Sequence, residues 1–262
     1  RKEWVLANTL LIHNVAVLFG MEHTENGGVL GRTEASSILI DAGKIAWIGP
    51  CDAAPTAQKM IDATGLIAMP GIVDCHTHTV WGGSRADEFR QRLSGTPYSE
   101  ILERGGGILS TVRHTRATTD AALLDATVAR FRRFVSHGVT TVEVKSGYGL
   151  TPDHERRMLT IALAAGARVG IRVMTTFLGA HAVPLEFRGN REAYVDHVIH
   201  EQIPNVAGVA DFIDVYVDRG AFTLDEGRRI LRAGRDAGLK LRIHAEQVDY
   251  TGAAEMAAEE GA

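Results

Sequence analysis

The feature that most constrains the fold of this 262-residue chain is an alternation of short apolar segments with helical patterns, which begins near residue 67. Five extended segments are predicted, and most are followed by apolar residues spaced as on one face of a helix. After the first strand, extended segments are predicted over residues 140–145, 170–177, 212–217 and 240–244, and helices over residues 99–104, 121–137, 152–165, 192–202 and 224–237. Strands that alternate with helices form parallel sheets or barrels, so the pattern predicts an α/β fold.

The segment before residue 67 follows a different pattern. Short extended pieces follow one another there, and the sequence Asp41-Ala42-Gly43-Lys44 is typical of a hairpin turn, because Gly43 can adopt a positive φ. A β-unit of this size is too small to be stable without support. We therefore expect two domains, residues 1–66 and residues 67–262.

The first strand of the second domain ends in two histidines. His76 and His78 are two residues apart, so on an extended strand they project from the same face. Two neutral imidazoles at this spacing suit one divalent metal such as zinc or iron. For the H-x-H pattern alone, an ordinary strand with two histidines near the surface is the alternative. The Pro70-Gly71 pair before the strand and the Gly82-Gly83 loop after it favour the mouth of a β/α barrel.

The composition excludes several classes of function. The chain is 45% hydrophobic, and its 28 basic and 32 acidic residues give a net charge of −4, with no basic run of the kind that binds nucleic acid. No apolar segment approaches the ~20 residues that a membrane span needs. No signal peptide is visible, and two cysteines, Cys51 and Cys75, make no disulfide framework. We expect a cytoplasmic protein that acts on a small molecule and binds neither nucleic acid nor a membrane.

Several motifs carry a resemblance to a known family. The segment P-G-I-V-D-C-H-T-H is similar to the first-strand signature of the amidohydrolase superfamily, whose members are metal-dependent hydrolases with a (β/α)8 TIM-type barrel. The longer match, H-T-H-T-V-W-G-G-S-R followed by E-V-K-S-G-Y-G-L, F-L-G-A-H and H-A-E-Q, resembles the imidazolonepropionase family. Four motifs in the right order are far more specific than one. The resemblance implies hydrolysis of the cyclic amide of 4-imidazolone-5-propanoate to N-formimidoyl-L-glutamate in histidine degradation. It also implies a homodimer, and a β-sandwich to which residues 1–66 contribute.

The resemblance also implies the metal ligands. His244, at the end of the fifth predicted strand, becomes the third ligand beside His76 and His78. The fourth predicted strand contains no lysine, the residue with which binuclear members of the superfamily bridge two metals, so we expect one ion, zinc or iron. Such an ion lowers the pKa of water towards ~7, which provides hydroxide to attack a cyclic amide.

The resemblance assigns Arg85, Tyr148 and Gln247 to substrate binding, and His181 to both substrate binding and catalysis. Arg85 is expected to clamp the propanoate carboxylate in a bidentate pair, with a surface arginine as the alternative. Tyr148 is expected to donate a hydrogen bond to the substrate, with an ordinary strand-to-helix turn as the alternative. Gln247 is expected to bind the imidazolone edge, because an amide can both donate and accept.

Two further residues are candidates for catalysis. His181 is expected at the ring carbonyl, where it would donate to the developing oxyanion. Glu246 is a candidate general base that shares a face with His244 if the strand continues, and orientation of a histidine is an equally good role for it. Lys145 is left undecided, because the segment around it lacks the upstream glycine of a phosphate-binding loop.

Two alternatives remain open, and one concerns the length of the barrel. The chain could be a different cyclic amide or amidine amidohydrolase or deaminase, or a barrel fragment without catalytic activity. Only five barrel strands can be counted, whereas a closed barrel has eight and needs ~250 residues of its own. We therefore expect a barrel truncated after five βα units. The family's strand-six histidine and strand-eight aspartate would then lie beyond Ala262.

Overall fold

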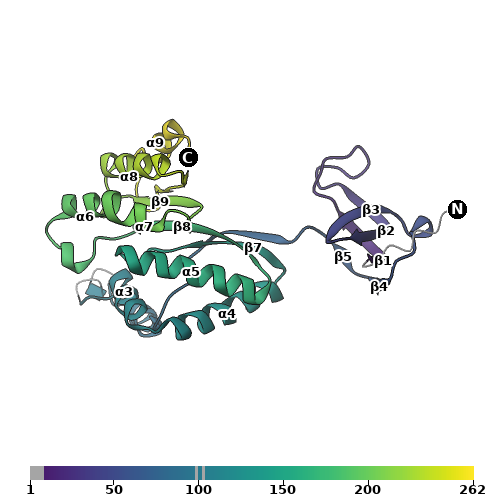
Figure 1. Ribbon diagram of the computed structural model, residues 1–262, viewed down its shortest axis with the longest axis horizontal. Coiled ribbons are helices and arrows are strands. Elements are labelled where there is room, and N and C mark those ends of the chain that lie inside the picture. The colour runs from purple at the N-terminus through teal and green to yellow at the C-terminus, as the bar shows by residue number, and fades with distance from the viewer. Residues whose placement is uncertain (1–8, 98–99, 102–103) are drawn as a thin grey trace. The chain divides into compact units, whose positions relative to one another are not determined.

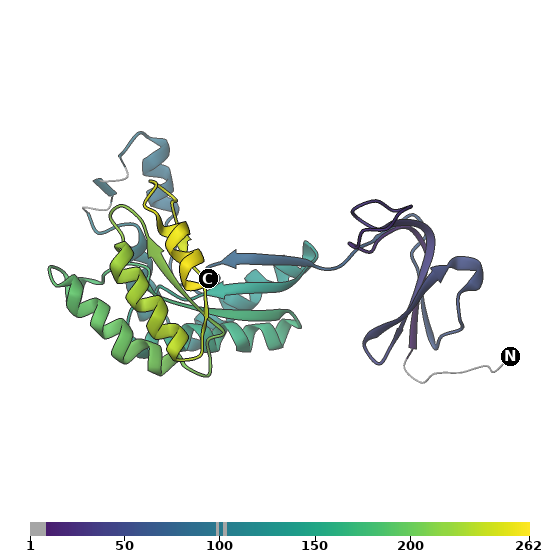
Figure 2. The same ribbon diagram turned by 90° about the horizontal axis from the view of Figure 1, so that it is seen from above.

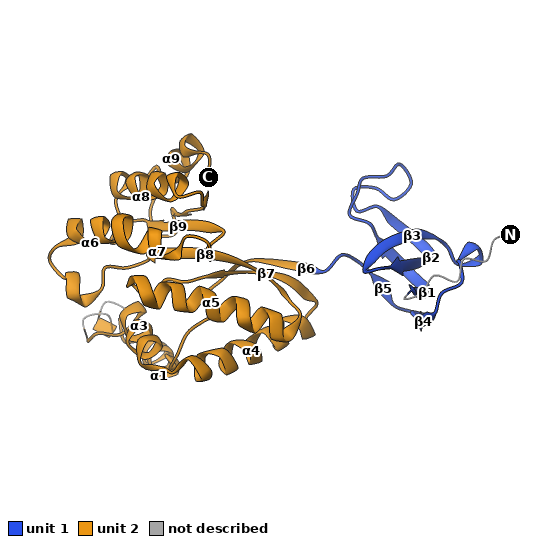
Figure 3. Ribbon diagram, in the orientation of Figure 1, with its two compact units in different colours: residues 1–71 blue, residues 72–262 orange. Residues whose placement is uncertain are grey.

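The computed structural model describes residues 9–97, 100–101 and 104–262, which form two compact units. The first unit ends at Gly71 and the second begins at Ile72 (Figure 3), whereas the sequence analysis placed this boundary between residues 66 and 67. The short helix that was predicted over residues 99–104 lies partly outside the described residues.

The first unit is a small sheet. Its strands are β1 (Thr9–Phe19), β2 (Arg32–Asp41), β3 (Lys44–Pro50), β4 (Lys59–Asp62) and β5 (Ile67–Ala68), in the order β3-β2-β1-β4, with β5 also paired to β1. Asp41 pairs with Lys44, and the two residues between them have φ angles of 48° and 76°. Two positive φ angles are the requirement of a two-residue type I′ turn. The predicted hairpin is therefore confirmed.

The second unit is built on a parallel sheet (Figures 1 and 2). Its strands are β6 (Ile72–Thr77), β7 (Val139–Lys145), β8 (Arg172–Ala180), β9 (Phe212–Val217), β10 (Lys240–Leu241) and β11 (His244–Ala245). The strands lie side by side in chain order, and β10 and β11 both pair with β9. Parallel strands in chain order with helical connections are the arrangement of half a β/α barrel. The predicted α/β fold class is confirmed, and the predicted fifth strand is interrupted at Arg242 and Ile243.

Helices connect the strands. The described helices are α1 (Ala86–Leu93), α3 (Ile108–Ala117), α4 (Asp120–Ser136), α5 (Pro152–Val169), α6 (Arg191–His197), α7 (Ile203–Val206), α8 (Leu224–Asp236) and α9 (Ala253–Glu260), and a π-helical segment (Val198–Gln202) joins α6 to α7. Helix α8 begins with a capping box, in which Thr223 and Glu226 each accept a hydrogen bond from the other's backbone amide. No helix in the described part of the chain combines the length and apolar character that crossing a membrane requires.

Helix α8 contacts β9 through two glycines that allow a close approach. Gly234 lies over Ile213, and a Cβ atom at this glycine would lie only 2.5 Å from Ile213 Cγ2. Gly227 is placed in the same way over Val217, with 2.5 Å from a Cβ position to Val217 Cγ2. Ile213 is fully buried, so it has little room to move aside.

We predict that Gly234→Ala destabilises the second unit. Alanine is about 1 kcal/mol better than glycine inside a helix, but overpacking against Ile213 should outweigh this and leave a net loss of about 1–3 kcal/mol in the free energy of unfolding. Urea unfolding measures the difference. Asp236→Ala, at an exposed position of the same helix, is the control and should change stability by less than about 0.5 kcal/mol. A Gly234→Ala protein as stable as wild type would show that the helix can move away from β9.

Candidate metal centre

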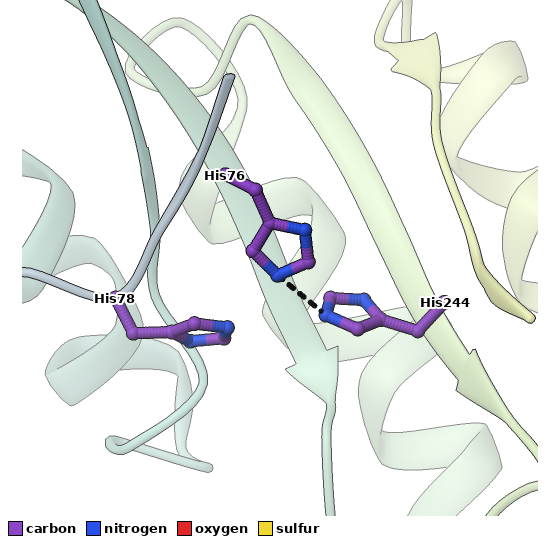
Figure 4. Close-up of side chains that lie close together, drawn as sticks. All are labelled: His76, His78 and His244. Carbon is purple, nitrogen blue, oxygen red and sulfur yellow. Dashed lines mark hydrogen bonds between the residues drawn. The ribbon is translucent and has the colours of Figure 1, made fainter. Parts of the chain in front are cut away.

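Three histidines meet at the carboxyl ends of the parallel strands. His76 belongs to β6, His78 follows that strand directly, and His244 begins β11. The Nε2 atoms of His76 and His244 are 3.0 Å apart, and one nitrogen from each ring lies within 4.8 Å of the other two. Figure 4 shows the three rings turned toward one another. The structure thus brings together the three residues that the sequence analysis assigned to a metal.

The lowered pKa values of His76 and His78 fit a metal site. Burial and, after it, the neighbouring histidines together lower the pKa of His78 to about 3. The pKa of His76 is also lowered, first by burial and then by His244 and Lys145. His78 Nδ1 is buried without a hydrogen-bond partner among the described residues. Neutral imidazole is the form that binds zinc and similar ions, so this donor set fits a divalent metal.

A cluster of buried charges lies next to the histidines. Lys145 on β7 places its Nζ atom 2.7 Å from Glu143 Oε1 and 2.8 Å from Asp214 Oδ2 on β9. These three side chains are at most 4% exposed. Arg242, at the interruption between β10 and β11, places Nη1 2.8 Å from Glu143 Oε1. Two cations and two carboxylates therefore balance one another, which is what buried charges require.

This cluster orients one of the three histidines. Asp214 Oδ2 lies 2.9 Å from His244 Nδ1, which favours the tautomer with its proton on Nδ1 and leaves Nε2 free to face His76. Burial raises the pKa of Asp214, but its contacts with His244 and Lys145 outweigh that effect, and the pKa is lowered. Sequence reasoning left Lys145 undecided and missed Glu143 and Asp214. The signal it could have used is the spacing of Glu143 and Lys145, which puts both on one face of a strand.

A cavity of about 780 Å³ opens over the histidines. This volume lies within the usual range for small-molecule sites. Among the described residues, the predicted site residues that line the cavity are His76, His78, Arg85, Tyr148, His181, His244 and Gln247. The structure therefore gathers all but one of the residues that were expected in the site.

The exception is Glu246. The prediction required the strand to continue past His244, but β11 ends at Ala245 and Glu246 adopts a left-handed conformation with φ 54°. Its Oε1 atom lies within hydrogen-bond distance of the Ala254 backbone amide, at 3.3 Å, near the start of α9. The condition for the expected placement beside His244, a strand that continues through Glu246, is therefore not met, and the carboxylate contacts α9 instead.

The structure also changes the hydrogen-bonding role expected of His181. Its Nδ1 atom lies 3.0 Å from the backbone carbonyl of Gly147. A carbonyl only accepts, so Nδ1 carries the proton and Nε2 of the neutral ring is an acceptor. Burial lowers the pKa of His181 to about 4, although the Gly147 carbonyl opposes this shift. At neutral pH His181 is therefore an acceptor, and the predicted donor role requires a protonated ring.

The loop that carries Arg85 is braced on both sides. The Arg130 guanidinium lies 3.6 Å over the Trp81 ring and donates to the carbonyls of Thr79 and Trp81. Gly83 has φ +75°, and a Cβ atom there would lie 2.5 Å from the His114 ring on α3. Arg85 itself is exposed, and no ion pair to a carboxylate of the described residues is formed by its guanidinium. A cation held this way is available to an anionic ligand.

The sequence is similar to that of several imidazolonepropionases. It is 42% identical to the enzyme of Polaromonas sp. over 243 residues, which cover 91% of this chain and 57% of that protein. Identity to the imidazolonepropionase of Paraburkholderia phymatum is 44%, over 87% of this chain and 57% of the relative. The Legionella pneumophila protein is 43% identical, over 86% and 58%. The resemblance seen in the motifs is confirmed, and the chain spans little more than half the length of these relatives. No family model matches the chain.

Solved structures support the fold. An adenosine deaminase from Xanthomonas campestris with bound zinc aligns over 96% of this chain and 55% of its own, with a TM-score of 0.60 and 13% identity. N-isopropylammelide isopropylaminohydrolase from Burkholderia multivorans aligns over 96% and 55%, with a TM-score of 0.58 and 22% identity. At these identities the likeness establishes the fold of the chain and leaves its substrate open.

We predict that His76→Ala and His244→Ala each abolish metal retention, because each removes one of the nitrogens that converge in the cluster. Metal content per chain, measured after dialysis against metal-free buffer, is the readout. His23→Ala, which removes an exposed histidine in the first unit, is the matched control and should retain the metal of wild type. Full metal occupancy in either cluster variant would contradict the assignment of ligands.

We also predict that Asp214→Asn weakens metal binding about 10–100-fold without removing a ligand, because the amide no longer provides the carboxylate that orients His244. The dissociation constant, measured by competition with a chelator, reports the change. Asp225→Asn, an exposed position in the first turn of α8, serves as the control. Equal affinities in Asp214→Asn and wild type would mean that His244 is oriented by other contacts.

Proposed function

We infer that the chain is a member of the imidazolonepropionase family and that its cavity hydrolyses the cyclic amide of 4-imidazolone-5-propanoate to N-formimidoyl-L-glutamate. The observation that carries this proposal is one cavity in which three histidines converge and an arginine faces the same space without an acidic partner among the described residues. The first feature suits a metal-dependent hydrolase, and the second suits a substrate with a carboxylate. Identities of 42–44% to imidazolonepropionases support the same conclusion.

The charges along the cavity favour an anionic substrate. Three arginines line it, Arg85, Arg191 and Arg219, and no aspartate or glutamate is found among its described lining residues. Arg219 is paired with Asp249 at 2.5 Å, and Arg191 lies 3.5 Å from Glu226. Arg85 is therefore the arginine of this group best able to bind the propanoate carboxylate, in a bidentate pair.

The side chains of this chain would bind and orient the imidazolone ring. A divalent ion held by His76, His78 and His244 would supply Lewis-acid chemistry that makes water a nucleophile near neutral pH. Gln247 can both donate to and accept from the polar edge of the ring. Neutral His181 offers Nε2 as an acceptor for a ring N–H, and Tyr148, whose ring centroid is 5.4 Å from that of His181, closes the same side.

The atoms and protons of the proposed hydrolysis balance. The oxygen of water adds to the ring carbonyl carbon, and the bond between that carbon and the ring nitrogen breaks. One proton goes to the leaving nitrogen, and the new carboxylic acid ionises. As parts of the same proposal we include zinc or iron as the ion, a homodimer as the working assembly, and the cytoplasm as its location.

The proposal is tested by hydrolysis assays with the metal-loaded protein. Imidazolonepropanoate is compared with cytosine, guanine and dihydroorotate, which lack the propanoate group and represent other cyclic amide and amidine substrates. We expect turnover of imidazolonepropanoate alone, with metal content measured on the same sample. Turnover of one of the other substrates would assign a different amidohydrolase activity. Full metal loading without turnover of any substrate would indicate a non-catalytic module.

We predict that Arg85→Ala keeps the metal and weakens substrate binding. Loss of a charge-assisted bidentate contact should cost on the order of 2–4 kcal/mol, seen as a higher KM or dissociation constant for imidazolonepropanoate. Binding of an analogue that lacks the propanoate should be unchanged. Arg172→Ala, at the amino end of β8 and far along the strand from the site, is the control. An unchanged KM in Arg85→Ala would show that this side chain does not bind the carboxylate.

A further inference from the structure

The loop between β7 and α5 contains two residues with positive φ, which is unusual for one of them, Leu150. Gly147 has φ +99°, and Leu150, which has a side chain, has φ +55° and is fully buried. A Cβ atom at Gly147 would lie 2.8 Å from the ring of His181, so the backbone approaches the site closely there. Such conformations persist only where the surrounding structure fixes them, and they are often found at functional sites.

A single buried carboxylate fixes this loop. The Glu155 side chain on α5 is 0% exposed, and its Oε2 atom accepts from the Gly147 amide at 2.8 Å. Its Oε1 atom accepts from the amides of Gly149 at 2.7 Å and Leu150 at 2.6 Å. Burial raises the pKa of Glu155, and hydrogen bonds from Ser146 and the three amides oppose this rise. One side chain therefore satisfies three backbone donors that would otherwise be buried without partners.

The loop touches the site at two points. The Gly147 carbonyl accepts from His181 Nδ1 at 3.0 Å, which sets the tautomer of that ring. The Tyr148 ring lies 5.6 Å from the ring of His78 and 5.4 Å from that of His181, between centroids. Glu155 acts on this loop through its hydrogen bonds with the backbone amides of Gly147, Gly149 and Leu150.

We propose that Glu155 is a positioning residue, whose carboxylate, by accepting three backbone amides, presents Tyr148 to the cavity and keeps the His181 proton on Nδ1. The loop thereby makes His181 Nε2 an acceptor, so the site selects a ring that offers an N–H at that point. The value of this selection to catalysis rests on the proposed function. The positioning role of Glu155 is independent of the proposed function, because it concerns only the conformation of the loop and the tautomer of His181.

The first test uses the wild-type protein and needs no turnover. Nitrogen-15 spectra of His181 at neutral pH should show a protonated Nδ1 and an unprotonated Nε2. Hydrogen exchange of the amides of Gly147, Gly149 and Leu150 should be about 100-fold or more slower than in an unstructured peptide. A proton on Nε2, or exchange at unstructured rates, would overturn the proposal without any variant.

The second test compares Glu155→Gln with Asp153→Asn. Glutamine has one acceptor oxygen, so its amide group must face a backbone N–H, and exchange in the loop should accelerate about tenfold or more, with His181 becoming a mixture of tautomers. Asp153 lies exposed in the same first turn of α5, so its variant removes the same charge from the helix start and should leave both readouts as in wild type. A folded Glu155→Gln protein with both readouts unchanged, or an Asp153→Asn protein that reproduces both changes, would refute the positioning role. Should Glu155→Gln not fold, the wild-type measurements decide the question.

Discussion

The site depends on the ammonium group of Lys145, which lies between two buried carboxylates. A carboxylate without a partner in such a setting costs several kcal/mol, and two of them facing each other would cost more. The Lys145 Nζ atom lies 2.7 Å from Glu143 and 2.8 Å from Asp214, so one cation is paired with both acids next to the histidines. Asp214 Oδ2 then lies 2.9 Å from His244 Nδ1, and the other nitrogen of that ring is left for a metal. The ligand geometry is therefore a consequence of how the protein balances charge beneath it.

The same cluster joins the strands of an open sheet at the end where the site lies. Glu143 and Lys145 come from β7, Asp214 comes from β9, and Thr176 of β8 donates to Glu143 Oε1 at 2.5 Å. Arg242 adds a contact from the interruption between β10 and β11. A parallel sheet is otherwise held by its backbone ladder and by the apolar packing of its faces. Polar contacts across three neighbouring strands fix their relative positions where a displacement of 1 Å would spoil a metal site.

Much of the fold could be predicted because the spacing of apolar residues along the sequence follows which side chains are buried. The strand expected over residues 212–217 coincides with β9, and α5 begins where the pattern places it, at Pro152. The histidine cluster could be predicted from motif resemblance, since each ligand stands at the end of an apolar strand. Asp214 could not, because its pairing with Lys145 depends on the register between strands about 70 residues apart. The position of Glu246 could not be predicted because Glu246 itself adopts a left-handed backbone conformation, which the pattern of side chains does not indicate. Glu155 resembles any acidic residue in the first turn of a helix, and only its burial distinguishes it.

One continuous segment carries both ends of the proposed substrate site. His76, His78 and, a few residues later on the following loop, Arg85 all line the cavity, and in the proposed function they would hold the reacting end and the carboxylate end of the substrate. The separation between the two is therefore set by the path of one loop. Arg130 fixes that path by stacking on Trp81 and by donating to two loop carbonyls, and the close contact of Gly83 with α3 removes the freedom that two adjacent glycines would otherwise give. A rigid spacing between a metal and a guanidinium discriminates by length, because a shorter or longer acid can reach one group only by leaving the other. Under the proposed function, this constraint would provide selectivity for a propanoate chain without any further contact to its methylene groups.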